Sequence, residues 1–391
     1  MKLIKGFFKW FLIILIILNL LILISGNTHI YKGLQNTYFK GRSGPSPTEY
    51  TIFENNEVKA GKEQVWALAN NYNKLKLPEI AKKELNEYHS LAYLVFKNDS
   101  ILYEEYWDEG APGSITNSFS MAKTFVSVLV GIAIGEGKIK SVDQKVGDFL
   151  PEFAEGSNSK LTVKHLLTMS SGINFDEDYV SPFAYPAKAY YGSDIRSLTM
   201  KYYITEEPGK VFKYLSGNTE LLAFVLEKAC GKSISEYASE KLWIPIGASK
   251  SAFWSLDHQG GVEKAYCCFN SNARDFARIG SLYMNNGNWH GKQIVPENYV
   301  QQSIVPAKLI DEENMPNDRY GYSWWMLDYK NMHIYYARGI LGQYVVVIPD
   351  KNLLMVRLGH KRSKEKIKDH PKDLFVYIDA ALNLDEQNNK H

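Results

Sequence analysis

The sequence contains little cysteine and almost no net charge, and each of these features argues against a class of function. Its 391 residues include three cysteines, Cys230, Cys267 and Cys268, whose spacing fits no zinc-binding motif. We interpret the adjacent pair Cys267-Cys268 as part of a buried core segment rather than as a redox site. The 45 basic and 43 acidic residues give a formal net charge of +2, which provides no electrostatic reason to expect a nucleic-acid partner. The sequence thus implies no metal, no cofactor and no nucleic acid.

Long hydrophobic runs are also scarce, and the most prominent one lies at the N-terminus. From Phe7 to Ile24 the chain is apolar except for Lys9 and Asn19, which is close to the ~20 residues that a membrane-spanning helix needs. A cleaved signal peptide is the alternative, but no A-x-A cleavage site follows the run, and no cysteine follows that a lipid could modify. We therefore expect residues 1–25 to be an uncleaved, single-pass signal-anchor in the cell membrane. Its lysines would stay inside, so the body would be periplasmic or extracellular.

The rest of the chain divides into a short polar segment and one large folded unit. Residues 26–60 are polar and turn-rich, which is typical of a linker or of an arm lying on the body. The folded unit spans residues 61–391. Within it, residues 61–87 have a helical periodicity that is broken at Pro78, and residues 90–107 have the pattern of a β-hairpin.

Helical patterns dominate the middle of the chain, and strands return in its last quarter. The expected helices are 125–134, 163–169, 219–230, 234–242 and 273–284, and the aperiodic segment 174–194 predicts a long loop. The expected C-terminal strands are 320–327, 332–337, 343–348 and 353–358, with a closing helix at 371–384. The simplest assembly is an α/β (α+β) fold, in which one antiparallel sheet built from both chain ends is flanked by terminal helices and carries an inserted all-helical lobe. The sheet lobe would comprise residues 61–115 and 318–391, and the helical lobe residues 116–317.

A hydroxyl and an amine share one face at the start of the first apolar helix of the body. Ser120 and Lys123 are three positions apart, which on a helix brings their Cβ atoms to about 5–6 Å. An amine held among apolar residues can act as a base, and Ser120 would then be an activated nucleophile. Alone, this Ser-x-x-Lys pattern is weak evidence, because a capping serine beside a solvated lysine is its more common meaning.

Two later segments give the pair a chemical context. Tyr214 and Ser216 lie in a turn before a helix, where a tyrosine hydroxyl could relay a proton to a leaving group. Arg338-Gly339 ends a strand, and a glycine there lets the backbone pass close to a ligand. The N–H groups of Ser120 and Ile340 could then form an oxyanion hole. A core tyrosine and an ordinary β-turn are the structural alternatives for these two segments.

In this order the motifs resemble those of the serine β-lactamase and penicillin-binding-protein superfamily. Ser120-x-x-Lys123 matches its first motif, Tyr214-x-Ser216 stands where Tyr-x-Asn is usual, and Arg338-Gly339 stands where Lys-Thr-Gly is usual. The surrounding sequence, including His165–Gly172 and Arg274–Arg278, is most similar to class C-related hydrolases, a group that includes 6-aminohexanoate-dimer hydrolases, esterases and D-amino-acid peptidases. The resemblance covers residues 85 to 360 approximately and implies a β-lactamase/transpeptidase-like fold.

The resemblance also implies a function and a set of site residues. It implies an exported serine hydrolase that cleaves an amide or ester bond of a small molecule or peptide through an acyl-enzyme on Ser120. Lys123 would be the base and Tyr214 the proton relay. The residues expected to bind the oxyanion or the substrate are Ile340, Gly339, Ser216, Tyr179 and Arg338. Among these, Tyr179 in the long loop is the candidate for holding a leaving amine.

Two alternative functions stay open on the sequence alone. One is a D-amino-acid carboxypeptidase or β-lactamase acting on cell-wall peptides, and the other is a non-catalytic, ligand-sensing member of the fold. Arg338-Gly339 argues against efficient β-lactam hydrolysis, because a Lys-Thr pair would offer an ammonium and a hydroxyl to the β-lactam carboxylate. We accordingly expect ester cleavage, weak cephalosporin turnover, and a gain in β-lactam acylation from the double change Arg338→Lys with Gly339→Thr.

Overall fold

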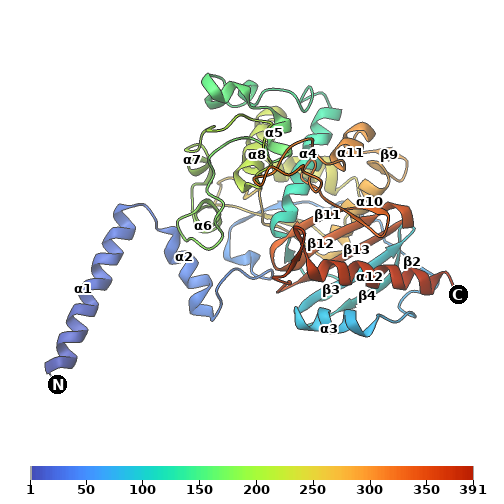
Figure 1. Ribbon diagram of the computed structural model, residues 1–391, viewed down its shortest axis with the longest axis horizontal. Helices are drawn as coiled ribbons and strands as arrows, with labels where there is room; N and C mark the ends of the chain where they lie inside the picture. The colour runs from blue at the N-terminus through green and yellow to red at the C-terminus, as the bar shows by residue number, and fades with distance from the viewer. Residues whose placement is uncertain (1, 391) are drawn as a thin grey trace.

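A computed structural model describes residues 2–390 and contains a sheet lobe and a largely helical lobe (Figure 1). The sheet lobe is built on a seven-stranded sheet in the order β10-β11-β12-β13-β3-β4-β2. In that order the strands are β10 (Trp325–Tyr329), β11 (Met332–Gly339), β12 (Gln343–Ile348), β13 (Leu353–Gly359), β3 (Ser90–Lys97), β4 (Ser100–Tyr106) and β2 (Ala67–Leu68). Neighbouring strands are antiparallel except β2 and β4. The expected sheet assembled from both ends of the chain is therefore confirmed.

Both faces of this sheet are buried, and successive side chains of each strand point to opposite faces. In β3, Leu94 and Phe96 belong to the core shared with the helical lobe, whereas Tyr93 and Val95 belong to a second core. On the first face α10 (Ala273–Met284) packs against β12 and β13. On the other face α3 (Glu79–Glu87) and α12 (Lys372–Asn388) cover the sheet (Figure 1).

The helix predicted before Pro78 does not form, which corrects the interpretation of residues 61–78. This stretch consists of turns and the short edge strand β2. It is held by contacts to distant residues, since the indole N–H of Trp66 donates to the carbonyl of Arg274 at 3.0 Å and its ring packs against Phe96. Val65, which contributed to the helical period, is 78% exposed and marks no buried face.

The helical lobe is arranged around α4 (Ala122–Gly135), which is apolar on all sides and buried along most of its length. The other helices of the lobe are α5 (Val163–Leu167), α6 (Tyr185–Tyr191), α7 (Ile195–Thr199), α8 (Ser216–Cys230), α9 (Ile234–Ala238) and α11 (Glu297–Ser303). Helix α6 lies inside the segment 174–194, so the expectation of a continuous loop there was wrong.

The lobe is also not all-helical as expected. It contributes to a small four-stranded sheet in the order β1-β6-β7-β5. Its strands are β1 (Asn55–Val58), β6 (Ala252–Ser255), β7 (Phe269–Ser271) and β5 (Thr116–Asn117). Two further pairs of very short strands complete the fold, β8 (Asn288–Trp289) with β9 (Lys292–Gln293) and β14 (Lys366–Ile367) with β15 (His370–Pro371). Such short strands carry too few residues for a recognisable alternation in the sequence.

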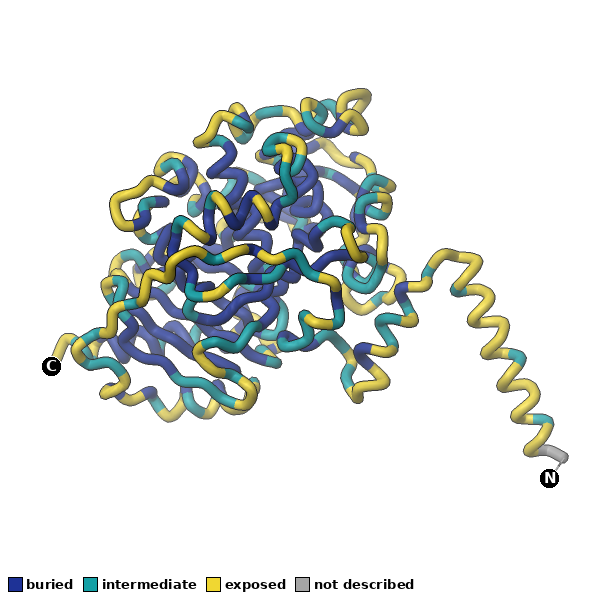
Figure 2. The backbone as a smooth tube through the Cα atoms, turned by 180° about the vertical axis from the view of Figure 1, so that it is seen from behind, coloured by how far each residue is buried: buried dark blue, intermediate teal, exposed yellow. Residues whose placement is uncertain are grey.

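The N-terminal helix α1 (Lys2–Ile24) projects away from the body, and Figure 2 shows it exposed along its length. Residues 4–24 are the one helical stretch of the described chain long and apolar enough to cross a membrane. A short turn leads to α2 (His29–Asn36), which packs against α6 (Figure 1). The imidazole Nε2 of His29 lies 2.7 Å from the carbonyl oxygen of Pro182, which fastens α2 to the body. The chain then runs on to β1 in the small sheet.

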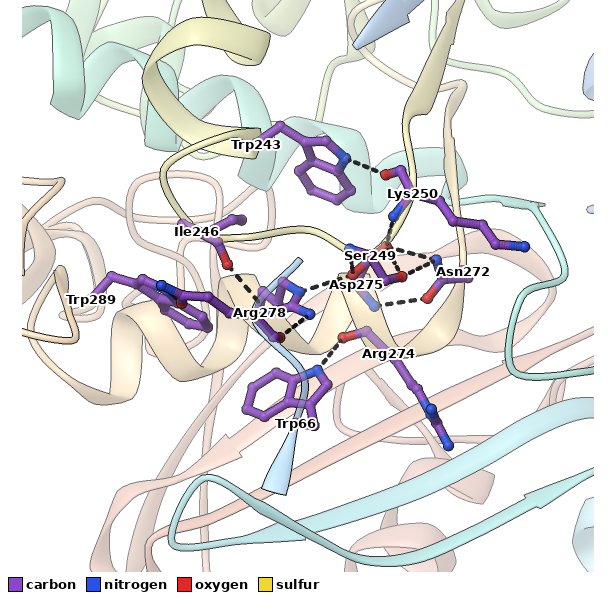
Figure 3. A network of polar contacts seen from close by, with 11 residues as sticks. Trp66, Trp243, Ile246, Ser249, Lys250, Asn272, Arg274, Asp275, Arg278 and Trp289 are labelled. Atoms are coloured by element: carbon purple, nitrogen blue, oxygen red, sulfur yellow. Dashed lines mark hydrogen bonds and ion pairs between the residues drawn. The ribbon is translucent and has the colours of Figure 1, made fainter. Parts of the chain in front are cut away.

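A buried ion pair at the start of α10 anchors this helix to its surroundings (Figure 3). The carboxylate of Asp275 accepts hydrogen bonds from Arg278 Nε and from both the N–H and the hydroxyl of Ser249. Such a pair is tolerated in a core only when further hydrogen bonds satisfy both charges. Arg274, on the same helix, pairs with Glu104 of β4. The Arg274–Arg278 segment of the sequence resemblance therefore has a structural role, which is to hold the helical lobe against the sheet.

Candidate active site

Ser120 and Lys123 meet at the start of α4, where a single 3-10 turn, η3 (Phe119–Met121), leads into the helix. Lys123 is 1% exposed. Its Nζ lies 3.3 Å from Ser120 Oγ, 3.2 Å from Ser216 Oγ and 2.8 Å from the carbonyl oxygen of Tyr266. The amine is thus surrounded by two hydroxyls and one carbonyl, with no carboxylate among these three contacts. This arrangement places the amine within hydrogen-bond distance of the Ser120 hydroxyl.

The backbone before Ser120 is held in a strained turn. Phe119 has φ of 46°, a left-handed conformation that is uncommon for a bulky residue. Its N–H donates to the side-chain oxygen of Asn117 at 2.8 Å, and the N–H of Ser118 donates to the carbonyl of Phe269 at 2.9 Å. Backbone strain of this kind persists only where surrounding contacts impose it, and it often occurs at functional sites.

Tyr214 adjoins the serine–lysine pair from the turn before α8. Its ring centroid lies 5.1 Å from Lys123 Nζ. The ring is fixed by aromatic neighbours, with centroid distances of 5.3 Å to Trp325 and 5.8 Å to Tyr320. The ring is thus fixed beside the Lys123 amine, although in the described residues the Tyr214 hydroxyl makes no hydrogen bond to Ser120 or Lys123.

A carboxylate that the sequence reasoning missed completes this side of the site. Glu177, in the loop before α6, accepts a hydrogen bond from the Ser216 N–H at 2.7 Å and another from the Ser216 hydroxyl. It also accepts the hydroxyl of Tyr179 at 2.8 Å, and that hydroxyl lies 3.4 Å from Ser216 Oγ. Burial raises the pKa of Glu177, and the nearby charge of Lys123 opposes that rise.

Ser216, rather than Asn218, occupies the place of the expected asparagine. Asn218, the third residue of α8, is buried, and its amide donates to the sulfur of Met169. Ser216 is the first residue of the helix, and its hydroxyl faces both Lys123 and Glu177. The departure from the usual motif therefore exchanges an amide for a hydroxyl that is itself held by a carboxylate.

The carbonyl that contacts Lys123 is positioned by a second buried carboxyl group. Glu220 of α8 accepts the N–H groups of Ala265 and Tyr266, at 2.9 and 3.4 Å. Burial raises the pKa of Glu220 to about 8, so its neutral form predominates at pH 7. The next two residues, Cys267 and Cys268, form a disulfide, and the interpretation of this pair as a buried core segment omitted that bond.

The strand end of β11 passes very close to the segment that contains Ser118 and Ser120. A Cβ on Gly339 would lie 2.3 Å from the carbonyl oxygen of Ser118, so this position must be glycine. Gly339 therefore corresponds better to the glycine of Lys-Thr-Gly than to its threonine, which places Ala337 and Arg338 at the first two positions. Threonine at 339 would collide with backbone, so the expected gain from Arg338→Lys with Gly339→Thr was wrong.

Arg338 and Ile340 flank this glycine and point to different surroundings. The guanidinium of Arg338 stacks 3.4 Å from the Trp325 ring centroid, and its Nη1 donates to the carbonyl of Asp369 at 3.0 Å. Arg338 lines an outer groove of about 1370 Å³, whereas Ile340 borders both that groove and the cavity that contains Ser120. The structure thus brings Ile340 into the cavity of Ser120 and leaves Arg338 outside it.

The cavity at Ser120 has a volume of about 350 Å³. Its walls come from α2, from the segment 43–45, from the loop and helix at 179–191, and from Phe119, Tyr266, Cys267 and Ile340. The contribution of the N-terminal arm could not be read from the sequence, because residues 26–60 carry no motif that indicates contact with a distant serine.

Comparisons with known proteins give a consistent result. The family model "Beta-lactamase" matches residues 81–377 of the chain. A 6-aminohexanoate-dimer hydrolase of Paenarthrobacter ureafaciens is 26% identical over 326 residues, which cover 79% of this chain and 82% of that protein. The structure of a Bacillus anthracis protein provisionally named a 6-aminohexanoate-dimer hydrolase has a TM-score of 0.75 and 22% identity, covering 88% of this chain and 93% of the other.

A family VIII carboxylesterase structure is also similar, with a TM-score of 0.62 and 17% identity over 81% of this chain and 98% of the other. At these identities the solved structures show the fold alone. The β-lactamase/transpeptidase-like fold expected from the sequence is therefore confirmed.

Proposed function

Because the chain belongs to the beta-lactamase family and is a serine hydrolase of the amidase or esterase type, we propose that it acts through an acyl-enzyme on Ser120. The observation that carries this proposal is the position of Lys123 Nζ, buried and 3.3 Å from Ser120 Oγ. An amine within hydrogen-bond distance of a serine hydroxyl is positioned to accept its proton and so to activate the nucleophile.

The proposed reaction begins when Ser120 Oγ attacks the carbonyl carbon and its proton passes to Lys123. The N–H groups of Ser120 and Ile340 stabilise the oxyanion of the tetrahedral intermediate. Tyr214 relays the proton from Lys123 to the departing amine or alcohol, and the acyl group remains on Ser120. Water then attacks the ester carbonyl and releases the acid, with the same groups moving the protons in reverse.

Glu177 and Tyr179 have supporting roles in this proposal. Glu177 orients Ser216 through two hydrogen bonds, and Ser216 in turn contacts Lys123, so Glu177 is a positioning residue. Tyr179, whose hydroxyl is held by Glu177, is placed to contact a leaving amine. The similarity to a 6-aminohexanoate-dimer hydrolase supports amide or ester cleavage rather than β-lactam hydrolysis. The guanidinium of Arg338 is occupied by Trp325 and Asp369 and so offers little to a β-lactam carboxylate.

We further propose that α1 anchors the enzyme in the cell membrane and that the catalytic body is exported. The support is the apolar stretch 4–24, which is exposed in the structure and long enough to span a bilayer. Its lysines near the N-terminus favour a cytoplasmic start of the chain, and hence an extracytoplasmic body.

The proposal is tested with p-nitrophenyl acetate, nitrocefin and the purified full chain. We expect Ser120-dependent ester hydrolysis well above background and weak nitrocefin opening. Lys123→Ala should reduce ester turnover nearly as much as Ser120→Ala does, because the two residues act as one unit. Nitrocefin turnover that matched the best ester in kcat/KM would instead favour the cell-wall peptidase or β-lactamase alternative, and the absence of any turnover would favour the ligand sensor.

A further inference from the structure

We propose that the cavity beside Ser120 binds a long, uncharged acyl chain, so that the substrate is an acyl ester or amide that partitions into the membrane. This inference rests on the proposed function and names its substrate class. It also assigns a role to α2, the helix that directly follows the membrane segment.

The composition of the cavity wall is the first argument. Among the residues that line it there is no lysine, arginine, aspartate or glutamate. Its one ionisable imidazole, that of His29, has a pKa lowered mainly by burial and lies 2.7 Å from the Pro182 carbonyl oxygen, so it is neutral at pH 7. A charged acyl group would lose its hydration here without gaining a counter-charge, whereas an apolar chain gains about fourfold in binding for each methylene group buried.

The position of the cavity is the second argument, and it distinguishes the acyl side from the leaving-group side. The cavity contains Ser120 and Ile340, the proposed oxyanion residues, but not Tyr214. Tyr214, the proposed donor to the leaving group, lines a separate cavity together with Glu177 and Lys213. Tyr179, the candidate for contacting a leaving amine, lines the uncharged cavity and donates to Glu177 of the other cavity, so it lies at the boundary between the two. The uncharged cavity, which holds the two oxyanion residues, is accordingly the one assigned to the acyl half.

The origin of the wall is the third argument. Ile30, Gly33 and Leu34 of α2 line the cavity, and only a short turn separates α2 from the apolar helix α1. At the rim, Val180 and Tyr38 are 92% and 65% exposed although both are largely apolar. Exposed apolar side chains around a cavity that adjoins a membrane anchor are consistent with entry of the chain from the bilayer.

The test compares p-nitrophenyl esters of acetate, butyrate, hexanoate, octanoate and decanoate. The enzyme is the full chain reconstituted in phosphatidylcholine vesicles. We expect kcat/KM to rise at least tenfold from the acetate to the octanoate. The ester of 6-aminohexanoate should be at least tenfold poorer than the hexanoate ester, after subtraction of the uncatalysed rate. A flat profile over chain length, or a preference for the amino ester, would overturn the inference.

Neighbouring positions of α2 provide a matched pair of variants. Leu34→Asp introduces a charge into the wall and should reduce the octanoate-to-acetate ratio more than tenfold, whereas Gln35→Asp, on an exposed position outside the cavity, should leave the ratio unchanged. Leu34→Trp fills the cavity and should move the optimum to shorter chains, which covers the case in which Leu34→Asp fails to fold. Equal ratios for Leu34→Trp and the unmodified chain would contradict the proposed wall.

The acyl-chain site and the proposed serine hydrolase function are contradicted by different results. Acetate hydrolysis that depends on Ser120 but shows no dependence on acyl length would leave the serine hydrolase intact and remove only the acyl-chain site. Ester hydrolysis that survives Ser120→Ala would remove the proposed function itself.

Discussion

Replacing Glu177 tests how the loop carboxylate holds the serine–lysine pair in place. In Glu177→Ala the Ser216 N–H loses its acceptor at the start of α8, and two hydroxyls, those of Ser216 and Tyr179, lose theirs. A lost cap costs ~1 kcal/mol, and an unsatisfied buried donor ~1–3 kcal/mol. We expect the free energy of unfolding to fall by ~2–3 kcal/mol for Glu177→Ala. For Glu177→Gln it should fall by ~1 kcal/mol, because the amide oxygen still accepts one bond.

The catalytic activity of Glu177→Ala should also fall, because the substitution removes the contacts that orient Ser216. A Ser216 hydroxyl released from Glu177 no longer has a fixed orientation toward Lys123, so kcat for a short ester should drop ~10–100-fold in Glu177→Ala, equivalent to ~1.4–2.7 kcal/mol in the barrier. KM should change much less, because Glu177 does not line the acyl cavity. Glu79→Ala is the control, since Glu79 on α3 forms only a surface ion pair with Lys82, which is worth ~0–1 kcal/mol.

The pH profile separates this positioning role from a merely structural one. Burial raises the pKa of Glu177, so its charge is lost at a higher pH than that of an exposed glutamate. The activity of the unmodified enzyme should therefore decline as the pH falls. Glu177→Gln keeps one hydrogen-bond acceptor at this position but no titratable group, so its activity should decline less steeply at low pH. The reasoning is refuted if Glu177→Ala retains normal kcat and stability, or if Glu177→Gln keeps the same decline at low pH.

Three further predictions address the framework of the site and the location of the protein. Gly339→Ala should destabilise the fold and abolish ester turnover, because its Cβ would lie 2.3 Å from the Ser118 carbonyl, and a variant with normal turnover would show that the strand can move away. The pKa of Glu220 is raised from 4.5 to about 8, so the contribution of protonated Glu220 to the free energy of unfolding is fully present below pH 4.5 and is lost as the pH rises toward 8. Between pH 5 and 7 the melting temperature should therefore decline, and Glu220→Gln should weaken that decline. This window lies below the pH at which Lys264 titrates, whose pKa is lowered to about 7. A decline of unchanged slope in Glu220→Gln would exclude Glu220 as its cause. The intact protein should pellet with membranes and resist carbonate extraction, whereas a mature N-terminus near Asn27 would identify a cleaved signal.

The parts of the fold that the sequence predicted are those with strong local patterns. The hairpin at 90–107 has apolar and aromatic runs on either side of a polar turn, and α10 was expected at residues 273–284, where it lies. The serine–lysine contact follows from helical spacing, because residues three apart share a face. These features need no knowledge of distant contacts.

The parts that could not be predicted depend on tertiary packing. Glu177 reaches Ser216 only because the loop folds back over the start of α8, and an acidic residue in a long loop carries no signal for such a contact. Likewise, Gly339 could be matched to the glycine of Lys-Thr-Gly only once the short distance between β11 and Ser118 was known. The wall formed by α2 depends on the packing of an arm that has no motif of its own.

Mass spectrometry of the covalently labelled protein tests the central claim most directly. The full chain is treated with a fluorophosphonate, digested and searched for the modified residue. We expect one adduct on the peptide that contains Ser120, none in Ser120→Ala, and strongly slowed labelling in Lys123→Ala, because Lys123 Nζ lies 3.3 Å from Ser120 Oγ and is the proposed base. An adduct on another residue, or labelling of Ser120 at an unchanged rate in Lys123→Ala, would contradict the serine–lysine mechanism.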